Sequence, residues 1–330
     1  MADGVYEDFA RWGEHARESP LYQELAARVS EDDELIALVA DIEHLPRPNM
    51  LFGAVQFLLD TDHELSHFYA SRTESPVGPA GAFPIFKQFA LDHAEEILDL
   101  GRTRFVQTNE VRRVAALMPA LMREADRLGE PVHLIEVGAS AGLNLCLDRF
   151  QYDFGGLEFG HSDVHLRVEL EGDVDVPTRA PYVQRRVGID KNPVDLNDPD
   201  DLRWLESLIW PEQVERRRRL RSAVRVRATV QVEMVRADAS SAIGGVIDRL
   251  PTAGPAIVFH TFTINQFNED QRARFDRALE GASARRSIVR IGFEYWDGTD
   301  DWPEIRVGLT EASLEPMMQA HPHGAWVRAL

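Results

Sequence analysis

A glycine-rich turn in the middle of the chain carries residue types that could bind a nucleotide or act as a nucleophile. Residues 132–145 (VHLIEVGASAGLNL) predict a buried strand, a turn hinged at Gly138 and Gly142, and the start of a helix. A helix that begins at such a turn presents unpaired backbone N–H groups and the positive end of its dipole to a ligand. The acidic residue Glu136 ends the strand, beside the predicted ligand position.

A row of acidic residues at the ends of successive predicted strands fits the donors of S-adenosylmethionine. Gly138 and Gly142 lack a Cβ where the methionyl carboxylate and the ribose would approach the backbone. Asp190 follows the second strand and would accept from the ribose diol, in a hydrogen bond worth about 1.5–3 kcal/mol. Asp238 follows the third strand and would accept from the adenine amino group.

The predicted cofactor site also includes Glu136, Ser140 and Asn144. His260 follows the fourth strand and is the predicted base if the reaction needs one, because an unperturbed imidazole titrates near pH ~6.5. Ligands of open α/β sheets bind outside the carboxyl ends of the strands. Methyl transfer depends mainly on positioning. The order of these residues therefore predicts an S-adenosylmethionine-dependent methyltransferase that acts on a small molecule.

The same turn matches the nucleophile elbow of serine hydrolases, Gly-x-Ser-x-Gly. In this alternative Ser140 is the nucleophile of an esterase, and Asp238 and His260 follow in the order Ser, Asp, His. An elbow normally follows several strands and an oxyanion-hole loop, whereas the preceding 130 residues show helical patterns. Glu136 also has no role in that chemistry. A third alternative is a protein that binds a nucleoside ligand without catalysis.

The elements that must position these residues change character near residue 129. Residues 1–128 carry apolar residues at helical spacing and predict an all-helical N-terminal cap domain. Residues 129–330 alternate strand and helix patterns and predict an α/β domain. We expect a Rossmann-like methyltransferase sheet there, mainly parallel with an antiparallel C-terminal strand. Residues 164–170 alternate strictly and predict one arm of an exposed hairpin.

Composition limits the partners. Lys and Arg number 36 against 55 Asp and Glu in 330 residues, a net charge of −19, which repels phosphate backbones and favours a small-molecule substrate over nucleic acid. The single cysteine, Cys146, excludes an intramolecular disulfide and fits a reducing compartment. The first residues lack the pattern of a secretory signal, and no apolar run reaches ~18 residues. We therefore expect no membrane partner and a cytoplasmic location, and the oligomeric state stays open.

Two histidine patterns could suggest a metal. His63-Glu-Leu-Ser-His67 matches the His-Glu-x-x-His pattern of zinc proteases, but it lies at the end of an apolar helix beside a loop rich in Ser, Pro and Gly. His161 and His165 flank Asp163 in the alternating segment, which is typical of a solvated face. We predict no metal site.

Motifs over nearly the whole chain resemble those of a bacterial family, domain of unknown function 2332. They are QTNEV at 107–111, EVGASAGLN at 136–144, DRFQY at 148–152, GIDKNPVD at 188–195, RWL at 203–205, WPE at 210–212 and VFH at 258–260. The chain departs from the family pattern at Glu64, Ala237 and Phe267, where Pro, Gly and Tyr are usual. The resemblance implies a methyltransferase-like sheet behind a helical region, and neither activity nor substrate. We expect the polar residues of 107–111 and 192–195 to reach the same cleft.

Overall fold

The computed structural model describes residues 2–42, 44–129, 131–296 and 302–330, which form two compact units. Unit 1 comprises Met1–Thr108 and Asp195–Arg218, and unit 2 comprises Asn109–Val194 and Arg219–Leu330. The predicted boundary at residue 128 differs from this division in two ways. The helix before the sheet groups with the sheet, and residues 195–218 group with the N-terminal helices. Glu130, beside the predicted boundary, lies outside the described residues.

Unit 1 is built from helices, as the apolar spacing predicts. They are α1 Ala2–His15, α2 Pro20–Val29, α3 Asp33–Ala40, α4 Arg47–Leu58, the 3₁₀ helix η1 Glu64–Phe68, α5 Ala82–Asp92, α6 Ala94–Thr103 and α8 Pro199–Ser207. Local signals set several of the starts, for example the Asp32 side chain, which accepts from the Leu35 N–H and caps α3. The aromatic rings of Phe9, Tyr22 and Phe52 lie in the apolar core.

A buried amide explains why residues 195–218 belong to unit 1. Gln56 of α4 is fully buried, and its side-chain nitrogen donates to the carbonyls of Ser207 (2.6 Å) and Ile209 (2.9 Å). Its side-chain oxygen accepts from Arg217 (2.8 Å) and Ser71 (2.8 Å). Buried polar groups need such partners, so the segment is held to α4 by hydrogen bonds as well as by apolar packing.

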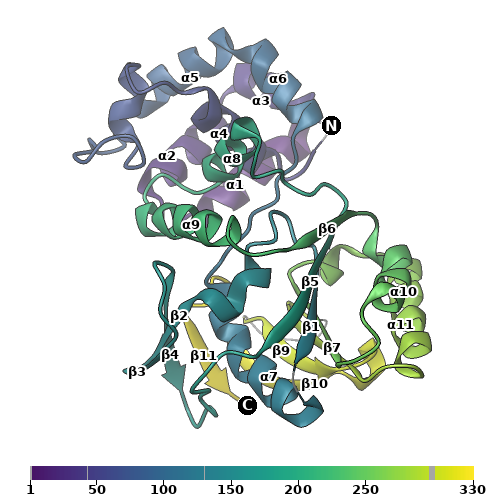
Figure 1. The fold of residues 1–330 in the computed structure, drawn as a ribbon. Coiled ribbons are helices and arrows are strands. Elements are labelled where there is room, and N and C mark those ends of the chain that lie inside the picture. Colours follow the sequence, from purple (N-terminus) through teal and green to yellow (C-terminus); the bar gives the residue numbers. More distant parts are fainter. Residues whose placement is uncertain (1, 43, 130, 297–301) are drawn as a thin grey trace. The chain divides into compact units, whose positions relative to one another are not determined.

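Unit 2 is built around one large, mostly parallel sheet (Figure 1). Its strands are β1 Val132–Val137, β2 Gln151–Phe154, β3 Leu157–Phe159, β4 His165–Glu171, β5 Val183–Asp190, β6 Glu233–Arg236, β7 Ala256–Thr261, β8 Ile288–Glu294, β9 Glu304–Gly308, β10 Glu315–Ala320 and β11 Trp326–Ala329. Their order in space is β3-β2-β4-β11-β10-β9-β8-β7-β1-β5-β6. The prediction of a mixed α/β unit with a mainly parallel sheet is confirmed.

Five strands at one end of the sheet carry the candidate site. These strands are all parallel and lie in the order β6-β5-β1-β7-β8. Numbered by their order along the chain, they have the spatial order 3-2-1-4-5. The strand order therefore reverses direction between β1 and β7. β9 pairs antiparallel with β8, and β10 pairs antiparallel with both β9 and β11.

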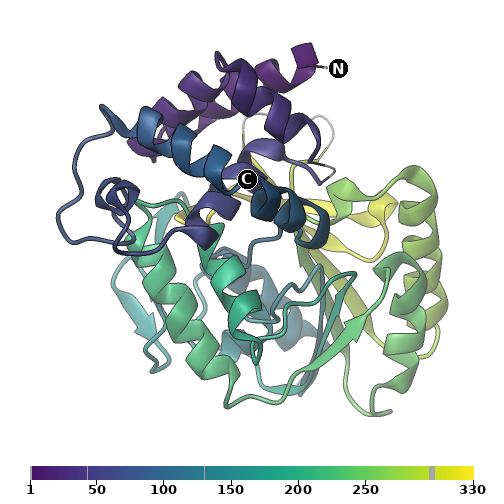
Figure 2. The ribbon, with the colours of Figure 1, turned by 90° about the horizontal axis from the view of Figure 1, so that it is seen from above.

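The helices of unit 2 are α7 Arg113–Leu128, α10 Ala239–Arg249 and α11 Glu269–Ser283, with short 3₁₀ turns at η2 Asn144–Arg149, η3 Ile264–Gln266 and η4 Glu311–Ser313. A further helix, α9 Val214–Arg227, spans the division between the two units. Both views show α10 and α11 side by side (Figures 1 and 2). Their apolar residues share one core with Ile135 and Val137 of β1. No helix in the described ranges has the length and apolarity needed to cross a bilayer.

Two local predictions are wrong. No α-helix follows the glycine turn, because β2 begins at Gln151 and leaves room only for the six-residue 3₁₀ helix η2, which is kinked at Cys146. Residues 164–170 are not a hairpin arm, because β4 runs parallel to both of its neighbours, β2 and β11. The strict alternation reports one buried face, with Leu166 and Val168 inside, and it cannot report the partner strand.

Candidate functional site

The carboxyl ends of β1 and β7 carry the strained backbone of the sheet. Among the described residues, Ser140 (φ 51°) and Phe262 (φ 52°) are the two non-glycine residues with positive φ. Each follows one of the two strands between which the strand order reverses. Such conformations cost on the order of 1–3 kcal/mol each and persist only where the surroundings hold them, which is common at functional sites.

The turn after β1 is held by hydrogen bonds from its own backbone. Five N–H groups donate within the protein: Gly138 (2.9 Å) and Ala139 (3.3 Å) to Ile189 O, Ser140 to Asp190 Oδ2 (2.8 Å), Gly142 to Ala139 O (2.7 Å) and Leu143 to Asn109 Oδ1 (3.1 Å). Since these donors are engaged and no α-helix follows, the turn does not present a row of free N–H groups. The predicted anion-binding helix start is therefore absent from residues 138–149 as described.

Asp190 ties the turn after β1 to the turn after β5. Its Oδ2 accepts from the Ser140 N–H and its Oδ1 accepts from the Asn192 N–H, both at 2.8 Å. The Val194 N–H donates to the Ser140 carbonyl (3.1 Å), so the chain after β5 lies against the glycine turn. Together with Asn109, these contacts bring residues of both segments, 107–111 and 192–195, to the turn, and the shared cleft expected for their polar side chains stays a prediction. A carboxylate oxygen has more than one lone pair, so Asp190 keeps acceptor capacity.

Glu136 is a buried acid with an unused oxygen. Its side chain is 1% exposed, and its Oε1 accepts from Asn144 Nδ2 (3.1 Å). Its Oε2, the Asn144 Oδ1 and the Ser140 Oγ are buried and have no hydrogen-bond partner among the described residues. Burial raises the pKa of Glu136 well above its ordinary value, and the nearby Asp190 adds to the rise, while Asn144 and Arg113 oppose it.

The side of the sheet that Glu136 faces follows from strand alternation. Ile135 and Val137 pack with α10 and α11, so Glu136 between them points to the opposite face, where η2 contacts β1. Two buried acceptors, Glu136 Oε2 and Asn144 Oδ1, and the Ser140 hydroxyl therefore lack partners at one strand end and its turn. Each such group costs free energy unless a hydrogen-bond partner reaches it.

The two glycines of the turn are required by protein packing. Gly138 has φ 74° and Gly142 has φ 69°, conformations that favour glycine. A Cβ on Gly138 would collide with the Thr263 side chain, and one on Gly142 would lie 2.9 Å from Met234 Sδ. The space that we predicted for the backbone approach of a ligand is thus filled by side chains after β7 and on β6.

His260 is fully buried, and both of its ring nitrogens are engaged. Arg290 Nε donates to His260 Nε2 (2.9 Å), and since a guanidinium only donates, the ring proton lies on Nδ1 and is donated to Glu294 Oε1 (2.6 Å). Burial lowers the pKa of His260, and the Arg290 charge acts in the same direction against the opposing effect of Glu294. In this geometry the imidazole is neutral and offers no free nitrogen to a substrate.

Glu294 fixes the turn after β7, a role that the sequence analysis missed. Besides His260, its Oε1 accepts from the Thr263 N–H (2.8 Å) and the Ile264 N–H (3.1 Å). It thereby holds the turn that contains the strained Phe262 and the Thr263 side chain packed on Gly138. In the sequence Glu294 is a single acid within the aromatic run FEYW at 293–296, and this pattern does not indicate which backbone groups it contacts.

Asp238 caps a helix. Its side chain accepts from the Ser240 N–H (2.9 Å) at the start of α10, from Gln271 Nε2 (2.8 Å), and pairs with Lys191 Nζ at 3.1 Å. Partial burial opposes ionisation, but the hydrogen bonds from Ser240 and Lys191 prevail and lower the pKa of Asp238 to about 2. Its predicted contact with adenine stays a prediction, and any ligand would share the carboxylate with these partners.

The structure thus brings Glu136, Ser140, Asn144 and Asp190 together around one turn. In the part of the chain that is described, no hydrogen bond joins Ser140, Asp238 and His260 into a catalytic triad.

The zinc-protease pattern does not form either. It begins at His63, the residue before the 3₁₀ helix η1, and in such a helix residues four apart point about 120° away from each other rather than to one face. His63 there accepts from the Leu65 N–H and so caps the turn.

Comparison with known proteins places the chain in a family but supplies no characterised relative. Neither the curated proteins nor the solved structures contain a match. One family model, described as "Uncharacterized protein conserved in bacteria", matches residues 4–329. This match covers the helices of unit 1 and the whole sheet with its candidate site, and the chain therefore belongs to the family of domain of unknown function 2332 (DUF2332).

Proposed function

We propose that this chain binds S-adenosylmethionine at the carboxyl ends of β1 and β5 and transfers its methyl group to a small molecule. The order of the five parallel strands β6, β5, β1, β7 and β8 supports the proposal, because the order 3-2-1-4-5 is that of doubly wound, Rossmann-like nucleotide-binding sheets. In such sheets ligands bind outside the carboxyl ends of the strands, at the point where the order reverses. That point lies between β1 and β7.

The unused Glu136 oxygen is the observation that carries the proposal. A carboxyl that is 1% exposed, with one oxygen unpartnered beside the unpartnered Asn144 carbonyl, is an acceptor pair that lacks a donor. S-adenosylmethionine carries an ammonium group and a positively charged sulfur, and either would favour the ionised form of Glu136. Asp190 has acceptor capacity left for the ribose diol.

The turn contributes rigidity rather than donors. Because its N–H groups are bonded to Asp190, Asn109 and the end of β5, the acidic side chains are held in place before a ligand arrives. When bound, S-adenosylmethionine supplies an activated methyl group, and the task of the protein is to hold donor and acceptor in line. His260 stays the predicted base, but it would first have to lose its bond to Glu294 or Arg290.

A small acceptor fits the charge of the chain. The net charge of −19 disfavours nucleic acid as a substrate. Burial raises the pKa of Glu136, so a cationic ligand would favour the ionised form of this carboxyl, whereas a phosphate would oppose its ionisation. The identity of the methyl acceptor is left to a screen of small molecules.

One observation keeps the hydrolase alternative worth testing. Ser140 combines a strained φ of 51° with an unpartnered Oγ, as a nucleophile on a sharp turn would. Ser140 is only 2% exposed, and its Oγ has no histidine partner among the described residues. We therefore expect no labelling by a fluorophosphonate probe. Labelling of the wild type that is lost in Ser140→Ala would replace the methyltransferase proposal with an esterase.

Isothermal titration calorimetry with S-adenosylmethionine and S-adenosylhomocysteine tests the proposal directly. We expect both to bind, and we expect Glu136→Gln and Asp190→Asn each to weaken binding about 10- to 150-fold, which corresponds to ~1.5–3 kcal/mol. Asp198→Asn is the matched control, because Asp198 makes the same contact to the N–H two residues on (2.9 Å) at the cap of α8. It should leave affinity unchanged.

Three outcomes of these experiments would change the proposal. Absence of binding to either ligand refutes the proposal. Binding that is equally strong in Glu136→Gln and Asp190→Asn refutes the assigned site while leaving the ligand. Binding without methyl transfer across a broad panel of small acceptors identifies a nucleoside-binding protein that does not catalyse methyl transfer.

A further inference from the structure

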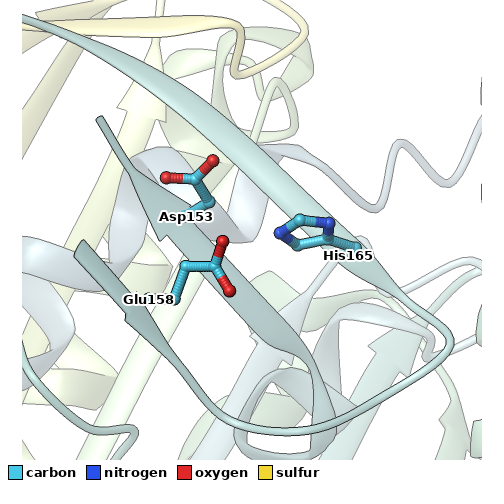
Figure 3. A group of neighbouring side chains, drawn as sticks. All are labelled: Asp153, Glu158 and His165. Carbon is cyan, nitrogen blue, oxygen red and sulfur yellow. The ribbon is translucent and has the colours of Figure 1, made fainter. Parts of the chain in front are cut away.

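The small sheet of β2, β3 and β4 brings three metal-ligating side chains together, far along the sheet from the candidate site. Asp153 lies on β2, Glu158 on β3 and His165 on β4. Their ligand atoms all lie within 4.8 Å of one another. Figure 3 shows the three side chains turned toward one another from three separate strands.

Strand pairing fixes this arrangement. Gly155 and Gly156, with φ of 66° and 101°, form a two-residue turn between β2 and β3, which sets Asp153 directly opposite Glu158. β4 runs on the other side of β2, where His165 pairs with Gln151. Since Gln151 and Asp153 are alternate residues of one strand, His165 projects from the same face as the two acids.

The opposite face of the small sheet is apolar. The rings of Tyr152, Phe154 and Phe159 are stacked there, with centroids 5.0–6.2 Å apart. This packing determines which face each strand turns outward, because a slip of one residue would bury the acids. The three ligand-bearing residues are therefore committed to one polar face by the core behind them.

The polar face is short of positive charge. Like charges directly opposite each other on paired strands are destabilising, and Asp153 and Glu158 are such a pair. Asp153 is only 8% exposed, and its Oδ1 accepts from the Gly156 N–H (2.7 Å). Among the described residues its one ion pair is with the largely exposed Arg167, 3.6 Å from its Oδ2. Within the described ranges Glu158 has no ion pair and accepts only from the Gln151 amide (3.2 Å), and the His165 ring has no hydrogen-bond partner.

We propose that Asp153, Glu158 and His165 bind one divalent transition-metal ion of the Zn²⁺ class. Two carboxylates and one imidazole suit such an ion, whereas Ca²⁺ and Mg²⁺ prefer oxygen ligands throughout. Bonds of about 2.1 Å in a tetrahedron place ligand atoms about 3.4 Å apart, so the group closes by rotation of the exposed Glu158 and His165 side chains. Three protein ligands leave the fourth position to water or another small ligand.

This proposal revises the expectation of no metal site. Along the chain, the neighbours of His165 that could bind a metal are His161 and Asp163. Pairing across strands instead places His165 beside Asp153 and Glu158, which lie 12 and 7 residues earlier in the sequence. An ion here would join the edge strand β3, only three residues long, to β2 and β4.

Zinc binding by the full chain tests the proposal. Protein freed of metal by a chelator is titrated with ZnCl₂ in competition with a chromophoric chelator, and thermal unfolding is recorded with and without the ion. We expect one Zn²⁺ per chain, bound at least about tenfold more tightly than by Glu158→Gln or His165→Ala. Bound Zn²⁺ should also raise the melting temperature of the wild type but not that of either variant.

Two matched substitutions control for general surface binding. His161→Ala removes an exposed histidine close by, and Glu169→Gln removes an exposed acid of β4, so both should bind Zn²⁺ like the wild type. Without metal, Glu158→Gln should be at least as stable as the wild type, because it removes a like-charge pair. Equal Zn²⁺ affinity in all five proteins, or an equal loss in the control variants, overturns the proposal.

Discussion

Replacing Glu294 with alanine should destabilise unit 2 strongly. The carboxylate is 1% exposed, and one of its oxygens accepts three N–H groups, from His260 (2.6 Å), Thr263 (2.8 Å) and Ile264 (3.1 Å). Each buried donor left without a partner costs about 1–3 kcal/mol, so the lower bound for three is about 3 kcal/mol. Removal of one partner from a buried charged network gives a similar figure, about 3–5 kcal/mol, and here Arg290 loses its neighbouring charge.

Urea unfolding followed by circular dichroism measures this loss. With a total stability on the order of 5–15 kcal/mol, a change of 3–5 kcal/mol moves the midpoint well outside experimental error. Glu315→Ala is the control, because Glu315 is an exposed acid at the start of β10. It should change stability by less than about 0.5 kcal/mol.

Glu294→Gln separates the acceptor from the charge. The amide oxygen still accepts the three N–H groups, and the desolvation cost of a carboxylate disappears, so we expect a smaller loss than for alanine. A loss below about 1 kcal/mol in Glu294→Ala would refute the conclusion that this side chain holds the turn after β7. Equal losses in the two variants would show that the charge, rather than the acceptor, matters.

Three further changes test the same region. The pKa of buried His260 is lowered, so as the pH falls below ~6.5 the unfolded chain binds a proton at this residue that the folded chain does not. Acid should therefore destabilise the wild type relative to His260→Gln. Urea midpoints of the two proteins that run parallel between pH 5 and 8 would contradict this. Gly138→Ala should lower the free energy of unfolding by at least about 1–2 kcal/mol because of the positive φ at this position. Adding Thr263→Ala should restore only the part of this loss that comes from the collision between the new Cβ and the Thr263 side chain, which a double-mutant cycle in urea measures. Asp238→Ala should cost about 0.5–2 kcal/mol as the lost cap of α10, and an unchanged melting temperature would show that the cap is not needed.

The sequence predicts β1, β7 and β8 well because their signal is local. These strands are runs of apolar residues buried on both faces, and such runs are typical of parallel strands between layers of helices. β2 and β10 are missed for different reasons. β2 follows a turn that resembles a helix start, and β10 contains Pro316 and no alternation. What distinguishes them is pairing with distant strands, which the local pattern does not carry.

The candidate site is predictable only where residues act on nearby backbone. An acid after a strand is often a helix cap, and Asp238 is one. The contacts of Glu294 lie 30–34 residues away along the chain, and those of Asn109 lie 34 residues away. Such contacts depend on how strands pair and how turns pack, so the polar residue types were visible in the sequence while their partners were not.

The hydrogen bonds of the glycine turn bear on which ligands the site can accept. A phosphate-binding loop needs free N–H groups, but here Ile189, Asp190 and Asn109 already accept four of those in the turn, and the Ala139 carbonyl accepts that of Gly142. The buried side-chain atoms left without partners at the turn are two acceptors, Glu136 Oε2 and Asn144 Oδ1, and the Ser140 hydroxyl, which can donate or accept. A ligand for this position must therefore donate hydrogen bonds or carry positive charge, because a phosphate would leave the acceptors unsatisfied and meet two acids. On this reasoning a dinucleotide or nucleoside triphosphate is a poorer ligand than S-adenosylmethionine, and competition of ATP or NAD⁺ for the same site would contradict it.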